Sequence, residues 1–345
     1  MPLRYLATLL LLSVTASAEP KAIFYLTPTA GSIRSFLAHA ARIDTVIPTF
    51  YAADAKGNVT GGPDQRVLDA ARKHGVTLMP IVANPGFRQE AVHALLSDAA
   101  ARARVSKKLL EECRTHQYRG IQLDFEQVPA ADRDALTALV RETAALFTPA
   151  GLRVSVAVMY RTGDAPSEPG YSRWLHDNWL GAYDLAALAK HAEFLSVMTY
   201  DQHTERTPPG PVAGLPWVAE VADYCLRSVP REKLSLGIPL YGRRWRAGVL
   251  GNEAVVLAGT MSSVEALGLA AQMKVEPQWD AEERAPWFYF YRDGVREYVF
   301  YNDARSFRER HDLARRRQLH SFSAWVLGQE DPEIWKDLPE AVRTK

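Results

Sequence analysis

Three polar side chains alternate with apolar ones in the segment 120–126, which reads GIQLDFE. In a β-strand Gln122, Asp124 and Glu126 would share one face, because successive side chains point to opposite sides. A carboxyl group that faces a protein interior is costly unless it is paired or functional. Because Glu126 ends the strand, it would lie at the C-terminal rim of a barrel, where active sites are built. The pattern also fits a buried, hydrogen-bonded pair with a structural role alone.

Seven further side chains lie in, or directly after, other apolar runs of the chain, and most of them are singled out only by the family resemblance given below. They are Tyr25, Met198, Tyr200, Asp201, Tyr241, Arg243 and Trp325. Several have a structural alternative, because Tyr200 beside Asp201 could close a strand with a hydrogen bond, and Tyr25 and Trp325 could fill the core. The nine histidines show no metal-ligand spacing. We therefore expect neither a metal ion nor a cofactor.

The elements that would position these residues are short β-branched runs that alternate with longer helix-like segments. Eight runs have the near-continuous hydrophobicity of parallel strands buried on both faces: 22–26, 45–51, 77–83, 120–125, 153–158, 194–199, 234–239 and 321–326. Between them, 132–147 carries apolar residues at helical spacing. The pattern predicts an α/β fold, a closed (β/α)₈ barrel whose active site would lie at the C-terminal ends of its strands.

One connection is much longer than a normal crossover between parallel strands. It runs from 240 to 321 and contains two aromatic, strand-like runs at 287–291 and 297–301, with the hairpin turn signal Arg292-Asp293-Gly294 between them. We predict a small α+β insertion at 243–300, between the seventh and eighth strands, and a helix at 305–318. The barrel would then comprise residues 19–242 and 301–345.

Residues 1–18 join a basic residue to an apolar run and a small Ala16-Ser17-Ala18 step, which predicts a signal peptide cleaved after Ala18. We expect a periplasmic or secreted protein without a stable membrane anchor, since no other apolar run approaches the length of a span. The net charge of +1 favours no nucleic-acid partner, and we expect a monomer. Cys113 and Cys225 lie in separate helix-like segments, which favours two buried thiols over a disulfide.

The segment GIQLDFE resembles the fourth-strand signature of glycoside hydrolase family 18, the chitinase-like barrels, whose pattern is Asp-Gly-x-Asp-x-Asp-x-Glu. Four further features resemble the family in the same order along the chain. They are the Met-x-Tyr-Asp motif at 198–201, the seventh-strand block at 236–243, the aromatic insertion, and the eighth-strand segment at 323–328 with its tryptophan. One such motif is weak evidence, whereas five in order are specific.

The resemblance implies a retaining glycosidase that cleaves β-linked N-acetylglucosamine polymers. Glu126 would protonate the glycosidic oxygen, and the acetamido oxygen of the substrate would attack in place of an enzyme nucleophile. Asp124 would orient the acetamido group, and Tyr200 would donate its phenol to the acetamido carbonyl. The remaining candidates are assigned to substrate binding. Gln122, Met198, Asp201, Tyr241, Arg243 and Trp325 are chosen because they lie in the matched motifs, and Tyr25 because of its place on the first strand.

Two family aspartates are replaced here, by Arg119 and Gln122. Gln122 can hydrogen-bond Asp124 but cannot relay a proton. The proton cycling described for chitinases therefore cannot pass through this position. A neutral amide at this position resembles the branch with spore-cortex and other peptidoglycan N-acetylglucosaminidases. Peptidoglycan is therefore favoured over chitin as the polysaccharide partner. The alternatives are a chitinase or chitobiase-like enzyme and a lectin-like barrel without turnover, against which the intact Glu126 argues.

Overall fold

The computed structural model describes residues 19–166, 170–250 and 253–341. The predicted signal peptide, residues 1–18, lies outside the described residues. Within the described ranges no helix is long and apolar enough to cross a membrane.

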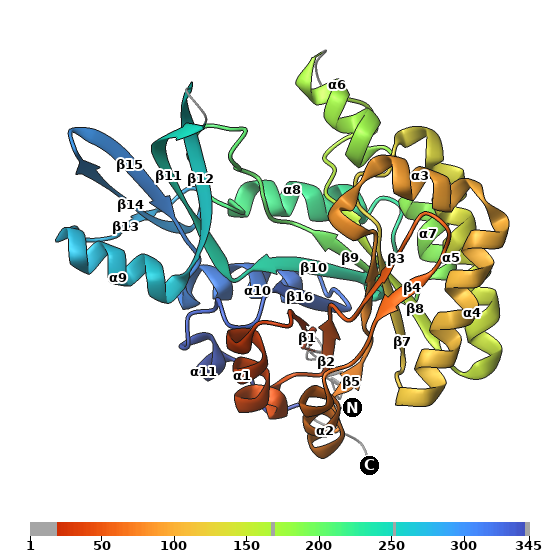
Figure 1. The fold of residues 1–345 in the computed structure, drawn as a ribbon. Helices are drawn as coiled ribbons and strands as arrows, with labels where there is room; N and C mark the ends of the chain where they lie inside the picture. The colour runs from red at the N-terminus through yellow and green to blue at the C-terminus, as the bar shows by residue number, and fades with distance from the viewer. Residues whose placement is uncertain (1–18, 167–169, 251–252, 342–345) are drawn as a thin grey trace, which may run out of the picture.

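Parallel strands curl into the ring that forms the larger part of the molecule (Figure 1). The neighbours around the ring are β3-β6-β7-β8-β9-β10-β16-β1-β2-β5. The strands span β1 (Lys21–Leu26), β2 (Thr45–Pro48), β3 (Tyr51–Ala53), β5 (Thr77–Leu78), β6 (Ile81–Ala83), β7 (Gly120–Asp124), β8 (Arg153–Met159), β9 (Leu195–Met198), β10 (Leu234–Pro239) and β16 (Ser321–Trp325). A short β4 (Val59–Gly61), which the sequence pattern did not predict, forms a hairpin with β3.

Two of the eight predicted strands are each interrupted in the structure. The second is divided into β2 and β3, and the third into β5 and β6. Because β2 pairs with β5 and β3 pairs with β6, the second and third strands still meet, and the ring closes. Pro48 and Pro80 lie at the two breaks, and proline has no N–H to donate to a ladder. The predicted (β/α)₈ barrel is confirmed.

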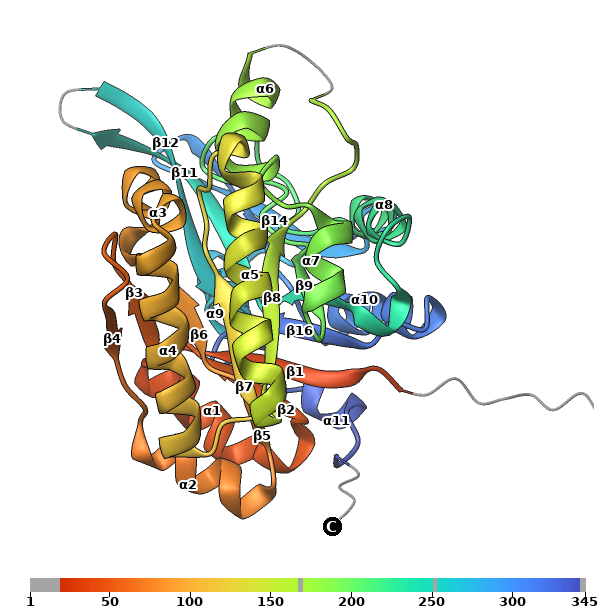
Figure 2. The same ribbon diagram turned by 90° about the vertical axis from the view of Figure 1, so that its right-hand side faces the viewer.

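Helices surround the ring, and Figure 2 shows α4 and α5 along its outer surface. They span α1 (Ala30–His39), α2 (Gln65–His74), α3 (Gln89–Ser97), α4 (Ala99–His116), α5 (Arg133–Phe147), α6 (Tyr171–Leu175), α7 (Leu185–His191), α8 (Leu215–Cys225), α10 (Ala304–Arg316) and α11 (Ile334–Asp337). The predicted helices at 132–147 and 305–318 correspond to α5 and α10. Cys113 of α4 and Cys225 of α8 are both buried and unpaired.

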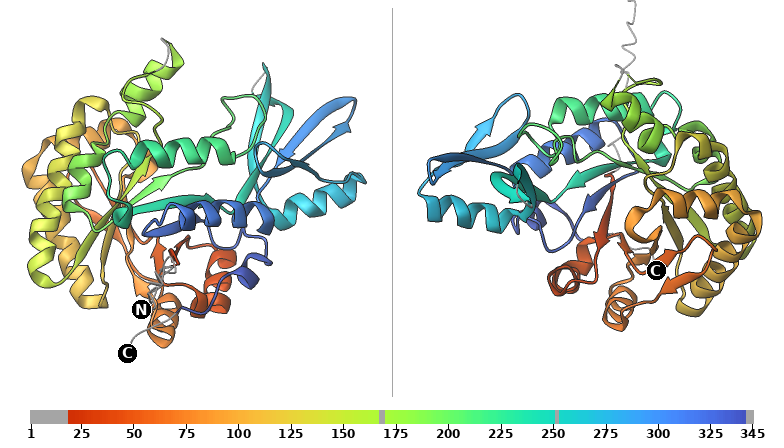
Figure 3. Two further views of the ribbon diagram at one scale, coloured as in Figure 1. Left: turned by 180° about the vertical axis from the view of Figure 1, so that it is seen from behind. Right: turned by 45° about the horizontal axis from the view of Figure 1, so that its top comes forward.

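A second, antiparallel sheet follows β10 and projects from the barrel (Figure 3). Its order is β12-β11-β15-β14-β13, and its elements span β11 (Tyr241–Leu250), β12 (Glu253–Ser262), α9 (Ser263–Met273), β13 (Gln278–Asp280), β14 (Ala285–Arg292) and β15 (Val295–Phe300). The turn between β14 and β15 has positive φ at both Asp293 (51°) and Gly294 (77°), as the predicted tight hairpin requires. Helix α9 covers one face of the sheet through a cluster that includes Ala266, Ala270, Phe288 and Phe290.

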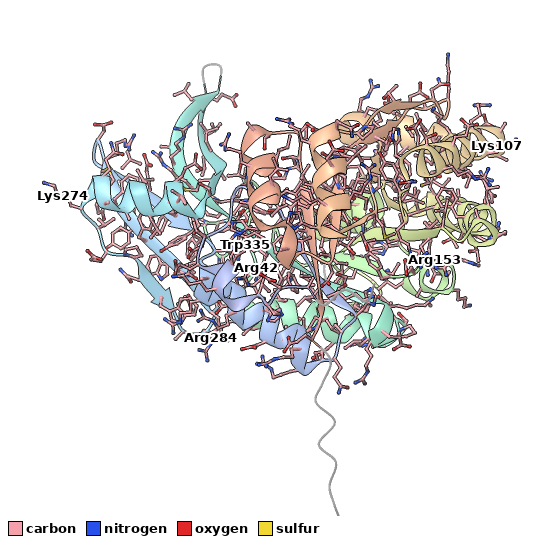
Figure 4. All side chains as sticks on the ribbon, turned by 90° about the horizontal axis from the view of Figure 1, so that it is seen from below. Arg42, Lys107, Arg153, Lys274, Arg284 and Trp335 are labelled. Carbon is pink, nitrogen blue, oxygen red and sulfur yellow. The ribbon has the colours of Figure 1, made fainter. Side chains whose placement is uncertain are left out.

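A buried arginine joins the second sheet to the barrel. Arg310 of α10 is fully buried, and its Nε donates to the carbonyl of Ala213 and its Nη1 to those of Arg284 and Ser306. Arg284 precedes β14 and is labelled in Figure 4 on the underside of the molecule. One side chain therefore holds three segments together. At the same end, Trp335 of α11 stacks on His39 of α1 at 4.2 Å between ring centroids.

Candidate active site

A cavity of about 490 Å³ opens at the C-terminal ends of the barrel strands, which is a typical size for a ligand site. Its wall includes nine of the ten residues predicted from the sequence, brought together from β1, β7, β9, β11, β16 and the segments that follow them. These nine are Tyr25, Asp124, Glu126, Met198, Tyr200, Asp201, Tyr241, Arg243 and Trp325. Residues up to 300 positions apart in the chain thus share one hollow.

Gln122 is the exception among the ten residues. It is fully buried within the barrel and does not line the cavity. Its side-chain amide donates to the hydroxyl groups of Ser155 (3.3 Å) and Ser196 (3.1 Å). The predicted contact between Gln122 and substrate is therefore wrong in this structure, because the residue lies two positions below Asp124 on the same strand and supports the barrel interior instead.

The interior of the barrel around Gln122 has a polar half and an apolar half. Six buried polar side chains lie on five neighbouring strands: Gln122, Ser155, Ser196, Ser235, Ser321 and Ser323. On the side of β1, β2 and β6 the interior is packed with Ile23, Ile47, Met79 and Ile81. The carboxyl groups of Asp124 and Glu126 therefore stand above the polar half, where dipoles lower the cost of a buried charge.

The two carboxyl groups differ in how deeply they are buried. Asp124 is buried and its Oδ1 has no hydrogen-bond partner among the described residues, whereas Glu126 is half-buried. Burial raises the pKa of Asp124. Burial raises the pKa of Glu126, and the charge of Asp124 raises it further. The indole of Trp179 lowers this pKa in part, although its N–H makes no hydrogen bond to a described residue. The pair thus holds a proton near neutral pH.

Two residues that sequence reasoning missed fix the backbone around Glu126. Asn84 follows β6 and is buried; its Oδ1 accepts from the Glu126 N–H and its Nδ2 donates to the Glu126 carbonyl, both at 3.0 Å. Tyr183 is also buried and donates its hydroxyl to the carbonyl of Phe125 at 2.8 Å. The only sequence signal for Asn84 is its place directly after a predicted strand, and Tyr183 gives none.

A charged network forms the wall of the cavity nearest to the second sheet. Asp201 Oδ1 accepts from the Tyr241 hydroxyl at 2.5 Å and from Arg243 Nη2 at 2.7 Å. Arg243 Nη1 also lies 3.6 Å from Glu205 Oε2. Asp201 has a φ of 60°, an uncommon conformation outside glycine that often marks functional sites. Both carboxylates of this wall therefore lie within ion-pair distance of a guanidinium.

Aromatic rings form the floor and part of the rim. Tyr25 and Trp325 lie 5.2 Å apart between centroids, and the Tyr25 hydroxyl is buried without a partner among the described residues. Burial raises the pKa of Tyr200 well above its ordinary value, so its phenol stays protonated and can donate. Trp179 lines the cavity, whereas Trp217 packs against Tyr160. In the described ranges, no three His, Cys, Asp or Glu side chains are placed to hold a metal ion.

Known proteins match this chain over most of its length. The model of Glycosyl hydrolases family 18 matches residues 21–330. A provisionally assigned sporulation-specific glycosylase of Bacillus subtilis (strain 168), YdhD, is 28% identical over 76% of this chain and 60% of its own length. The cortical fragment-lytic enzyme of the same organism is 28% identical over 90% of this chain and 72% of its own length. The crystal structure of a chitinase from Chromobacterium violaceum ATCC 12472 has a TM-score of 0.82, with 26% identity, over 92% of this chain and 97% of that one.

The residues that line the cavity lie within the range that matches the family. The matched range covers the whole barrel and the second sheet, and the motifs that carry the family pattern meet around Asp124 and Glu126. The chain therefore belongs to glycosyl hydrolases family 18 and is a glycosidase.

Proposed function

We propose that this glycosidase hydrolyses β-linked N-acetylglucosamine polymers with retention, with Glu126 as general acid. The observation that carries the proposal is the placement of Asp124 and Glu126 together in a cavity floored by Tyr25 and Trp325. An aromatic floor suits the apolar face of a sugar ring. Burial keeps Glu126 protonated near neutral pH, as a proton donor to a leaving oxygen must be.

The nucleophile in this proposal is the acetamido oxygen of the substrate. The remaining carboxylates of the cavity, Asp201 and Glu205, both lie within ion-pair distance of Arg243, which disfavours their attack on an anomeric carbon. Asp124 would accept the acetamido N–H and offset the positive charge of the oxazolinium intermediate. Tyr200 would donate its protonated phenol to the acetamido carbonyl. This arrangement needs no enzyme nucleophile and no metal ion.

We propose peptidoglycan as the polymer. The cortical fragment-lytic enzyme supports this choice by its name, and Gln122 supports it as a neutral amide where chitinases carry an aspartate. Chitin is the second candidate, because the solved chitinase shares the fold over nearly all of both chains. Export by the predicted signal peptide remains a prediction, consistent with an extracytoplasmic polymer.

The test compares two substrates and one variant. Purified protein is incubated with a fluorogenic chitobioside and, separately, with purified peptidoglycan, and released fluorophore and muropeptides are measured. Glu126→Gln keeps the shape of the side chain but removes the transferable proton, so turnover should fall at least ~10²-fold on both substrates. A variant as active as the wild type would exclude Glu126 as the acid. A further incubation, with colloidal chitin, decides between the two polymers, since oligomer release from chitin without muropeptide release from peptidoglycan would decide for chitin.

A further inference from the structure

The face of the second sheet opposite α9 carries a row of aromatic side chains that the proposed reaction does not use. We propose that this face binds the part of a carboxylate-bearing glycan strand that extends beyond the cavity. This inference rests on the proposed function and adds to it a second contact surface and a preference for an anionic polymer. The residues that define this open face are Phe300, Trp287, Tyr298, Tyr289, Arg296 and Tyr291.

The pairing register places these side chains on one face. Directly opposed residues of antiparallel strands point to the same side of the sheet. Phe300 pairs with Arg243 on one neighbouring strand and with Trp287 on the other, and Tyr298 pairs in the same way with Trp245 and Tyr289. The last pair of the row is Arg296 with Tyr291. The row therefore starts at a residue of the cavity wall, Arg243, and runs outward across three strands.

The rings of the row contact one another and become more exposed with distance from the cavity. Trp287 stacks on Phe300 with centroids 5.6 Å apart and planes 12° apart, and on Tyr289 at 6.2 Å. Tyr289 is 37% exposed and Tyr291 is 54% exposed. Figure 3 shows α9 against the opposite face of the sheet. Contiguous exposed aromatic rings of this kind mark an interaction surface.

Arg296 gives this surface a charge preference. Its guanidinium lies within 5.9 Å of the ring centroids of Tyr289, Tyr291 and Tyr298, and donates to the hydroxyl groups of Tyr291 and Tyr298. No carboxylate of the described residues lies within ion-pair distance of it. The tyrosines therefore hold a cation in place without neutralising it. A guanidinium fixed in this way can bind a carboxylate through two parallel hydrogen bonds.

Two buried residues of β11, Arg243 and Trp245, lie between the cavity and the open face. Trp245, in the same row as Tyr298, donates its indole N–H to the carbonyl of Thr204 at 3.2 Å, and Thr204 lines the cavity. Beyond the two β11 residues the row is partly exposed at Phe300 and Trp287 and exposed at Tyr291 and Arg296. Sugar rings stack on such rings through their apolar faces. A glycan whose substituents carry carboxylates matches both features, whereas a neutral glycan uses only the aromatic rings.

The experiment measures binding separately from turnover. In a Glu126→Gln background, co-sedimentation with insoluble purified peptidoglycan and with chitin gives binding isotherms at low and high salt. We expect Tyr289→Ala/Tyr291→Ala to weaken binding to both polymers about tenfold. We expect Arg296→Gln to weaken peptidoglycan binding about threefold at low salt, and less at high salt, without affecting chitin binding. Leu267→Ala, an exposed change on α9, is the control and should bind like its parent.

Isotherms for the aromatic double variant that match those of Leu267→Ala would overturn the proposal. Equal effects of Arg296→Gln on chitin and peptidoglycan would overturn its anionic part. The same three changes in the active enzyme are assayed on the fluorogenic chitobioside as an internal reference, since a general folding defect would lower that rate as well. If the wild type fails to cleave either polymer, the proposed function fails, whereas the binding isotherms still test the open face on their own.

Discussion

The two sheets of this glycosidase use aromatic and ionisable side chains in opposite ways. In the barrel, Tyr25 and Tyr200 are buried beside Asp124, and burial raises the pKa of both the phenols and the carboxyl group. In the second sheet, Tyr289 and Tyr291 are exposed, and Arg296 among them is solvated. Burial keeps an acid protonated near neutral pH, whereas reversible contact with a polymer requires rings that are exposed at the surface. The difference separates a site for chemistry from a surface for binding.

The cost of burying a carboxyl group in the barrel should appear as a dependence of stability on pH. The pKa of Asp124 is raised in the folded state, so the fold retains a proton that the unfolded chain loses, and stability falls as pH rises from about 4 through the raised pKa. Asp124→Asn removes this penalty. We expect the variant to be more stable than the wild type by on the order of 2 kcal/mol at pH 8, with little difference at pH 4.

Denaturant unfolding at the two pH values measures this difference. Glu276→Gln, which changes an exposed carboxylate between α9 and β13, is the matched control and should show no such pH dependence. If the wild type is as stable as Asp124→Asn at pH 8, burial of the Asp124 carboxyl group does not destabilise the fold. That result would contradict the contrast drawn between the two sheets.

A smaller effect is expected where the barrel positions its acid through the backbone. Asn84→Ala removes both hydrogen bonds to Glu126, so the carboxyl group should be less well placed, and kcat on the chitobioside should fall about tenfold with little change in KM. Asn84→Asp keeps the acceptor for the Glu126 N–H and should restore part of the rate. Asn58→Ala, in the exposed β3–β4 turn, controls for loss of an asparagine. A loss confined to stability, with kcat unchanged, would make Asn84 structural only.

Removing an exposed ring from the second sheet should change the free energy of unfolding least. Tyr291→Ala removes a ring that is already 54% exposed, so the free energy of unfolding should change by less than about 0.5 kcal/mol. Phe322→Ala in the barrel, where the ring is fully buried, should cost about 3–5 kcal/mol by the same measurement. Similar costs at the two positions would show that the open face is part of a core.

The sequence predicted the order and place of the barrel strands because parallel strands buried on both faces are almost continuously apolar. It did not predict the breaks in the second and third strands, where Pro48 and Pro80 interrupt ladders whose partners are set only by the closed ring. The β14–β15 hairpin was predicted well, since its turn depends on two local residues with positive φ, Asp293 and Gly294. Features that depend on neighbouring residues in the sequence were therefore predicted better than features that depend on which strands pair.

The candidate site shows the same division. Asp124 was found from the alternation along its strand, whereas Tyr200 and Trp325 were found from motifs that resemble the family, and all three line the cavity. Asn84 was missed because its role exists only once β6 and β7 lie side by side. Gln122 was misplaced by one layer, since alternation gives the face of a strand but not the depth at which the cavity stops.

The anchoring of the second sheet has a consequence for the width of the cavity, whose wall includes Tyr241 and Arg243 of β11. Arg310 receives no carboxylate partner within ion-pair distance in the described ranges and spends its donors on backbone carbonyls of three segments, one of which precedes β14. A guanidinium can hold such oxygens only at fixed separations. We therefore expect this side chain, which does not line the cavity, to govern how thick a polymer the cavity admits.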